Sequence, residues 1–188
     1  MIEYAFPTPI YHNRVGDFDN IQSKITHSLS KLDFDYNPKW GKTHLITPTL
    51  PQKEMKRCGL NSLLSEIDIH LYQYCSDLNF DLKSYDICGW FSKFGKDNYA
   101  HLHHHGTADF TGVYYYRGNG EDGLLMFEAP NPYLAHSKCY SNSPVCSWKH
   151  TPLEGKILIF PGWLQHAVIP LTTNDERISF SFNVYVLR

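Results

Sequence analysis

The last part of the chain alternates strictly between polar and apolar residues, which is the pattern of a β-strand with one buried face. In the run Arg177–Val184 every second residue is apolar, and the polar positions are Arg177, Ser179, Ser181 and Asn183. One face is therefore suited to a core, whereas the other is polar and carries a cation. Taken alone, the pattern is equally typical of a strand whose polar face meets solvent.

Eight short segments after residue 80 have strand-like patterns and are separated by Gly, Pro, Asn and Asp turns. They are Tyr85–Phe94, Tyr99–His105, Thr111–Arg117, Gly123–Glu128, Ser147–His150, Lys156–Phe160, Ala167–Ile169 and Arg177–Leu187. Strands at such close spacing, without helices between them, favour a sandwich or barrel over a parallel α/β fold. We therefore predict a mainly β (α+β) protein whose jelly-roll core spans residues 85–188.

Helical periodicity occurs before this β region. Apolar residues recur at helical spacing from about Phe18 to Leu32, after the candidate N-caps Asp17 and Asp19. A second helix is predicted after the capping pair Asn61-Ser62. Its apolar stripe consists of Leu63, Leu64, Ile67, Leu71, Tyr74, Cys75 and Leu78. We expect the two helices, within residues 17–80, to pack on the outer face of one sheet.

The remaining N-terminal segments lack a clear period. Tyr4–Val15 is rich in proline and aromatic residues, which suits an extended segment at a sheet edge. Residues 33–52 predict a loop with one strand at His44–Ile46. The later segment Ala129–Pro144 interrupts the strand pattern and predicts either a lid over a site or a plain crossover.

Composition indicates one globular domain over residues 1–188. The chain has 188 residues, 42% of them hydrophobic and 15% aromatic, with a net charge of -2. This balance gives no basic surface for a nucleic-acid backbone, so no nucleic-acid partner is expected. Five cysteines without a C-x-x-C spacing indicate reduced thiols, and no run is long and apolar enough to span a membrane. We expect a soluble, cytoplasmic protein without a signal peptide, and a homodimer is compatible with the sequence.

The chain has eleven histidines, and four of them lie between His101 and His105. A histidine tract is often a surface loop that binds metal opportunistically. If Tyr99–His105 is a strand, however, His101 and His103 share one face about 7 Å apart. Together with His166 on a later strand they form a three-ligand set that leaves metal coordination positions open.

Four sequence blocks between Trp90 and Tyr185 have a recognisable spacing. They are Gly95-x-x-Asn98-x-x-His101-x-His103, Thr111-Gly-Val-Tyr-Tyr115, Phe160-Pro-Gly-Trp-Leu-Gln-His166 and Glu176-Arg-Ile-Ser-Phe-Ser-Phe-Asn183. In these blocks the chain resembles a bacterial and viral group of 2-oxoglutarate/Fe(II)-dependent oxygenases, within the prolyl-hydroxylase-like superfamily. The resemblance implies a double-stranded β-helix, a cupin-like form of the jelly roll.

The resemblance also implies a site and a reaction. His101, His103 and His166 would hold Fe(II), and Arg177 would pair with the distal carboxylate of 2-oxoglutarate. The remaining candidates are Tyr115 and Ser179 for the co-substrate, and Asn98, Trp163 and Trp90 for the pocket. The enzyme would consume 2-oxoglutarate and O2, release succinate and CO2, and hydroxylate a peptidyl residue, an amino acid or a small metabolite.

The chain departs from the superfamily pattern at the metal ligands. Most members have a carboxylate where this chain has His103, which predicts a three-histidine centre or a water ligand in its place. The group usually has proline after the second histidine, but this chain has His104 there and two extra residues before Thr111. A shifted set that uses His103 and His105 therefore remains open.

Two other classes of protein also fit parts of the pattern. A cupin-like metal enzyme without 2-oxoglutarate, or a zinc hydrolase, would share the three histidines. A non-enzymatic jelly-roll module would carry them incidentally. Arg177, at its distance of eleven residues from His166, distinguishes the oxygenase, because the other classes have no need of it.

Overall fold

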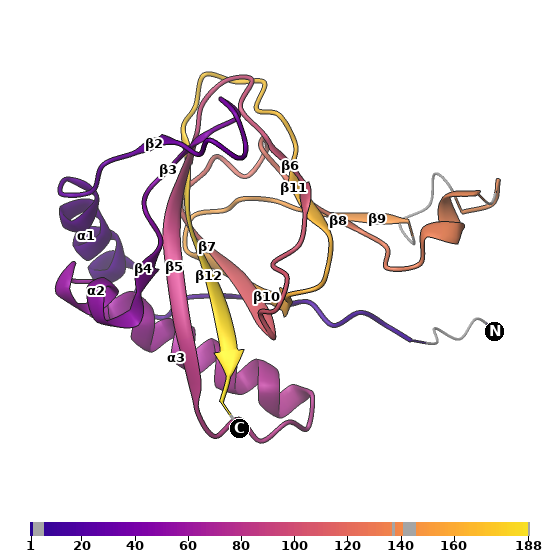
Figure 1. Ribbon diagram of the computed structural model, residues 1–188, viewed down its shortest axis with the longest axis horizontal. Coiled ribbons are helices and arrows are strands. Elements are labelled where there is room, and N and C mark those ends of the chain that lie inside the picture. Colours follow the sequence, from indigo (N-terminus) through magenta and orange to yellow (C-terminus); the bar gives the residue numbers. More distant parts are fainter. Residues whose placement is uncertain (2–5, 137, 141–145, 188) are drawn as a thin grey trace.

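The protein consists of two antiparallel β-sheets that face each other, with helices on the outside of one of them (Figure 1). The computed structural model describes residues 1, 6–136, 138–140 and 146–187. The larger sheet has the strand order β1-β10-β7-β12-β5-β3-β2, with β4 also paired to β5. The smaller sheet has the order β6-β11-β8-β9. This arrangement agrees with the jelly roll predicted from the strand pattern.

The strand bounds lie close to the predicted segments. The larger sheet contains β1 (Tyr11–Arg14), β2 (Asp35–Tyr36), β3 (Leu45–Ile46), β4 (Leu50–Pro51), β5 (Tyr85–Phe94), β7 (Phe110–Arg117), β10 (Lys156–Pro161) and β12 (Arg177–Val186). The smaller sheet contains β6 (Ala100–His103), β8 (Leu125–Glu128), β9 (Ser147–His150) and β11 (His166–Val168).

Three α-helices lie before the β region: α1 (Phe18–Leu29), α2 (Gln52–Arg57) and α3 (Asn61–Asp77). They pack on the outer face of the larger sheet, as predicted for α1 and α3 (Figure 1). Their buried side chains join the apolar face of β12, whose residues Ile178, Phe180, Phe182 and Val184 are all buried. The alternation of β12 therefore follows from burial of one face beneath the helices.

A second, smaller core lies between the two sheets. It contains Phe94, Val113, Leu158 and Phe160 from the larger sheet, with Leu125 and other residues from the smaller one. The polar face of β12 points to this side, because its Arg177 and Ser179 are buried there beside Phe94 and Ser92 of β5. Arg177, Ser179 and Ser181 of this face line the space between the sheets, and the first two of them are shielded from bulk solvent.

Several local features differ from the sequence predictions. The short helix α2 was not predicted, because it has six residues and buries only Met55, which is too few positions for a periodic stripe. α3 begins at Asn61 itself, so Asn61 does not cap it. Asp17 precedes α1, but its carboxylate accepts a hydrogen bond from the Asn20 side chain and caps no backbone N–H.

Two further observations concern the rest of the chain. Within the predicted loop Ala129–Pro144 the structure describes a 3-10 helix at Pro132–His136, while residues 137 and 141–145 lie outside the described part. This helix projects away from the two sheets (Figure 1). Among the described residues, no helix has the length and hydropathy that crossing a membrane requires.

Candidate active site

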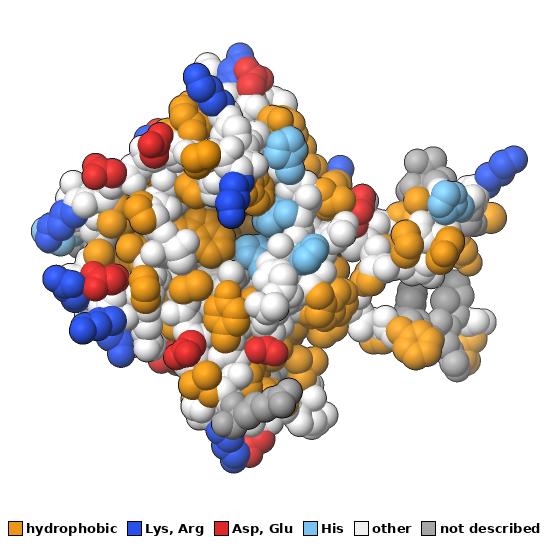
Figure 2. Space-filling view, in the orientation of Figure 1, with side chains coloured by type: hydrophobic (Ala, Val, Ile, Leu, Met, Phe, Trp, Pro, Cys, Tyr) orange, Lys and Arg blue, Asp and Glu red, His pale blue; other side chains and the backbone are white. Residues whose placement is uncertain are grey.

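A cavity of about 280 Å³ opens between the two sheets. Its described lining includes Arg177, Ser179 and Ser181 from β12, and the three residues His103, His105 and His166. Figure 2 shows histidine side chains gathered beside a hollow near the centre of one face of the molecule. These three histidines and these polar residues of β12 therefore line the same cavity.

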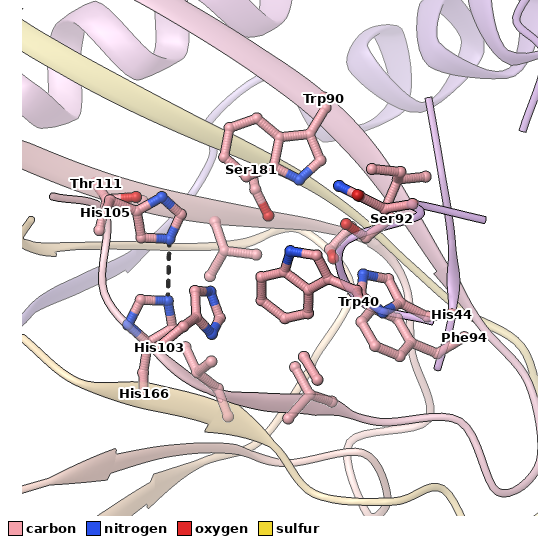
Figure 3. Close-up of a pocket in the computed structure, with 18 of the residues that line it drawn as sticks. Trp40, His44, Trp90, Ser92, Phe94, His103, His105, Thr111, His166 and Ser181 are labelled. Atoms are coloured by element: carbon pink, nitrogen blue, oxygen red, sulfur yellow. Dashed lines mark hydrogen bonds between the residues drawn. The ribbon is translucent and has the colours of Figure 1, made fainter. Parts of the chain in front are cut away.

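The histidine cluster consists of His103 at the end of β6, His105 just after it, and His166 at the start of β11. His166 lies opposite His103 in the antiparallel register of the two strands, which brings their rings to 4.3 Å between centroids. His105 stacks on His166, and their Nε2 atoms are 3.1 Å apart (Figure 3). One ring nitrogen from each of the three residues lies within 4.8 Å of the others.

Backbone carbonyls fix the orientation of two of these rings. The His103 Nδ1 is 2.7 Å from the carbonyl oxygen of His101, and the His166 Nδ1 is 2.8 Å from that of Leu164. A carbonyl only accepts hydrogen bonds, so each Nδ1 carries the proton and donates it. The Nε2 of both rings is consequently left with a lone pair that is free to bind a metal.

The cluster is held in its uncharged form. Burial, together with the neighbouring His103, lowers the pKa of His105 to about 4. Burial also lowers the pKa of His166 well below its usual value, with the same contribution from His103 and His105. Neutral imidazole is the form that binds metal ions, so the three residues are ready to bind one at neutral pH.

The three histidines fit a divalent metal ion. Imidazole nitrogens bind such ions at about 2.1 Å, which places adjacent ligand nitrogens about 3 Å apart. The 3.1 Å between His105 and His166 matches this spacing. The donor set is all nitrogen, because no aspartate or glutamate is among the described residues that line the cavity.

His101, which the sequence analysis placed in the metal set, does not join the cluster. It is exposed, and its ring packs edge-on against Tyr99 at 4.9 Å. The physical reason is a β-bulge: two steps along β11, from His166 to Val168, correspond to three steps along β6, from His103 to Ala100. The extra residue breaks the alternation that would have placed His101 and His103 on one face. The cluster corresponds to the shifted set, which uses His103 and His105. When the spacing to Thr111 is counted from His105 as the second histidine, it no longer contains two extra residues.

Arg177 and Tyr115 form a second buried polar group. Arg177 is only 3% exposed, and its Nε and Nη1 have no hydrogen-bond partner among the described atoms. Its guanidinium lies 4.7 Å from the centre of the Phe94 ring and 5.1 Å from that of Tyr115. The Tyr115 hydroxyl is likewise buried without a partner, and burial raises its pKa while Arg177 opposes the shift.

The buried charge of Arg177 favours an anion nearby. Burial lowers the pKa of Arg177, and the contact with Tyr115 opposes that change. A guanidinium nevertheless stays charged in proteins, and a buried charge without a partner costs several kcal/mol. An anion beside Arg177 and Tyr115 would offset this cost, so the chemistry of the arginine end of the cavity is suited to an anion.

The other pocket candidates fall into two groups. Trp90 lines the cavity and stacks on His105, with ring centroids 5.7 Å apart. Asn98 and Trp163 do not line it: the Asn98 side chain accepts a hydrogen bond from the backbone N–H of Gly95, and Trp163 is 52% exposed. Asn98 therefore stabilises the turn before β6.

Two lining residues, Trp40 and His44, were missed by the sequence analysis. Both come from the N-terminal region near β3, and Trp40 lies edge-on to His103 with centroids 4.5 Å apart (Figure 3). His44 is buried and stacks on Phe94 at 4.5 Å. Their segment has no clear period, so only the three-dimensional structure could bring them to the cavity.

Comparison with known proteins identifies the fold and the family. Residues 89–183, half of the chain, match the model of a family described as "Putative 2OG-Fe(II) oxygenase". No curated protein matches the chain in sequence. Among solved structures it resembles a prolyl-4-hydroxylase from Pseudomonas putida, with a TM-score of 0.67 at 12% identity, covering 96% of this chain and 94% of the other.

Two further structures share the fold. A prolyl hydroxylase from Trichoplax adhaerens, in complex with a hypoxia inducible factor peptide, has a TM-score of 0.64 at 13% identity and covers 94% of this chain and 83% of its own. HygX from Streptomyces hygroscopicus, with nickel, 2-oxoglutarate and hygromycin B bound, has a TM-score of 0.62 at 14% identity, with coverage of 95% and 83%. The predicted double-stranded β-helix is thereby confirmed. The chain belongs to the 2-oxoglutarate- and Fe(II)-dependent oxygenases, whose cofactors are Fe(II) and 2-oxoglutarate.

Proposed function

We propose that this oxygenase is a hydroxylase whose Fe(II) is held by His103, His105 and His166. Arg177, assisted by Tyr115 and Ser179, binds the distal carboxylate of 2-oxoglutarate. In the overall reaction, 2-oxoglutarate, O2 and a substrate C–H group yield succinate, CO2 and the corresponding alcohol. The bound iron supplies the activation of O2, while the chain orients both organic molecules and limits access of water.

The observation that carries the proposal is the placement of two unsatisfied groups in one cavity. The histidine cluster offers nitrogen lone pairs, and Arg177 offers two guanidinium nitrogens without partners. An α-keto acid with a distal carboxylate matches both, because its keto acid group chelates metal and its far end is an anion. Ser179 lies opposite Ser92 in the strand register, so hydroxyl groups line the path between the two ends.

The part of the cavity next to the histidines indicates the kind of substrate. Trp40 and Trp90 flank the histidines and leave room for an organic group next to the metal. The fold neighbours include one protein with a bound peptide and one with bound hygromycin B. We infer that this chain likewise hydroxylates a peptidyl residue, an amino acid or a small metabolite.

An anaerobic titration of the Fe(II)-loaded protein with 2-oxoglutarate tests the co-substrate site. Chelation gives a weak visible charge-transfer band, and we expect it to saturate. In the Arg177→Gln variant the apparent affinity should fall about 100-fold, since a charge-assisted pair is lost from a buried site.

Arg117 provides a matched control for this experiment. It is an exposed arginine near the start of β12 that pairs with Glu176, and it does not line the cavity. Arg117→Gln should leave the titration unchanged. Equal 2-oxoglutarate affinity in the wild type and in Arg177→Gln, with iron bound in both, would remove Arg177 from the co-substrate site.

A further inference from the structure

We propose that the substrate of this enzyme carries a monoanionic group, a carboxylate, close to the carbon that is hydroxylated. The inference rests on the proposed function, and it adds the charge of the substrate, which neither the family nor the fold assigns. It follows from the charges that the cavity holds once the metal and the co-substrate are in place.

The cavity has a surplus of positive charge. A divalent metal with three neutral imidazoles keeps its full charge of about +2, and Arg177 adds about +1. The dianion 2-oxoglutarate cancels about two of these charges, so about one positive charge remains. A site with a carboxylate ligand would have no surplus, whereas this one lacks any carboxylate among its described lining residues.

The nearby acidic residues do not supply a negative charge that would balance this positive charge. The Asp109 carboxylate accepts a hydrogen bond from the backbone N–H of Val186 at 2.8 Å. Glu176, next to Arg177 in sequence, pairs with Lys93 at 2.6 Å and with Arg117 at 2.9 Å. Glu176 is therefore neutralised by two cations, the Asp109 carboxylate is bound to the backbone of β12, and neither residue lines the cavity.

The mouth of the cavity likewise has no carboxylate among its described lining residues. Thr49 and His104 line it and are exposed, so they mark its open end, and the partly buried Asn37 adds an amide. Blue side-chain atoms of lysine or arginine border the hollow in Figure 2, whereas the red atoms of acidic residues lie away from its rim in this view. An anion entering here meets hydrogen-bond donors and a positive potential, whereas a cation is repelled.

The apolar part of the substrate has its own surface. Trp40 lies edge-on to His103, and Trp90 stacks on His105, so indole rings border the metal-binding cluster (Figure 3). These rings favour an apolar or ring-shaped body beside the reacting carbon. These contacts thus indicate a compact organic acid, or an acidic residue within a peptide, in which the carboxylate and an apolar portion lie close together.

The test uses probes of one skeleton that differ in charge: 3-phenylpropionate, 3-phenylpropanamide and 3-phenylpropylamine. The protein is first loaded anaerobically with Fe(II) and saturating 2-oxoglutarate, and the charge-transfer band reports that both stay bound. Binding of each probe is then measured by calorimetry and by tryptophan fluorescence, without any turnover. We expect the carboxylate to bind about tenfold more tightly than the amide, and the amine to bind most weakly.

A charge introduced at the mouth gives a matched pair of variants. Thr49→Asp places a carboxylate at an exposed lining position, and Thr49→Asn places an uncharged group of the same size there. The aspartate should weaken binding of 3-phenylpropionate about threefold to tenfold while leaving the amide unchanged. The asparagine variant carries no charge and is the reference against which the effect of the aspartate is measured. Added salt should weaken the carboxylate selectively.

Each outcome bears on one proposal. Absence of the charge-transfer band overturns the proposed function itself. A normal band with equal binding of the three probes, tighter binding of the amine, or no binding of the carboxylate at millimolar concentration overturns the charge inference alone. Tighter binding of the dianion 2-phenylethyl phosphate than of the carboxylate overturns the assignment to a monoanion.

Discussion

At the scale of single residues, the bulge in β6 decides which histidines can meet. Because β6 has one residue more than β11 between their paired positions, His101 turns outward and His103 turns inward. His105 then reaches the cluster from beyond the end of the strand, where its backbone N–H donates to the Gly162 carbonyl at 2.8 Å. Strand parity applied to the sequence could not reveal this, because a bulge leaves no periodic signal.

The choice between the two histidine sets can be tested directly. His105→Ala should weaken Fe(II) binding by about 100-fold or more, since it removes one of the three nitrogen donors. His101→Ala should leave the affinity almost unchanged, because its ring lies outside the cluster. Metal content after dialysis against a competing chelator measures both. Loss of iron in His101→Ala with retention in His105→Ala would restore the unshifted set.

At the scale of elements, close contact between β5, β7 and β12 depends on two glycines. Gly89 of β5 and Gly112 of β7 lie against the rings of Phe180 and Phe182. A Cβ at Gly112 would collide with the Phe182 ring and with the carbonyl oxygen of Leu158. The absent side chains thus leave room for the two phenylalanine rings beneath the helices.

We expect Gly112→Ala to lower the free energy of unfolding by about 1–3 kcal/mol, because the added methyl group overpacks the core. Gly16→Ala is the matched control, since its Cβ would approach no described atom closer than 3.5 Å. It should change stability by less than about 0.5 kcal/mol. Urea denaturation followed by circular dichroism measures both, and equal midpoints would contradict the packing argument.

Comparison of the predicted and observed helices and strands shows which of them the sequence pattern could identify. Alternation and helical periodicity report burial, so they predicted β5, β12, α1 and α3 with bounds close to those of the structure. The segment that carries Trp40 and His44 packs through a few side chains from an irregular loop, which has no period to detect. Arg177 was predicted from the resemblance of the block Glu176–Asn183 to the oxygenase pattern, because the alternation of this strand alone is equally typical of a polar face that meets solvent.

At the scale of the whole molecule, several histidines are buried without charge. Burial lowers the pKa of His44 and of His150 to about 4 each, and His70 shifts in the same direction. In the unfolded chain these groups titrate near 6.5. The unfolded state therefore binds protons first as the pH falls, so the folded state loses stability between about pH 6.5 and pH 4.

His150 allows this pH dependence to be tested away from the active site. It is 5% exposed, lies between Trp148 and Phe127, and has an Nε2 without a partner among the described atoms. His150→Phe keeps a ring there but removes a proton-binding group, so the apo-protein should lose up to about 3 kcal/mol less stability over this pH range. Thermal unfolding at several pH values measures the difference. Parallel curves for the wild type and the variant would show that His150 does not titrate as described.

The two faces of β12 determine which mutations can alter the cavity without affecting the core. Residues 178, 180, 182 and 184 are buried in the core beneath the helices, whereas residues 177, 179 and 181 line the cavity. A mutation at Ser181 can alter the cavity without disturbing the buried face, because neighbouring positions in a strand lie on opposite sides of the sheet. New substrate preferences are thus accessible by substitution at Ser181, which lines the cavity and is not one of the residues proposed to bind 2-oxoglutarate, and directed evolution of this enzyme should begin at that position.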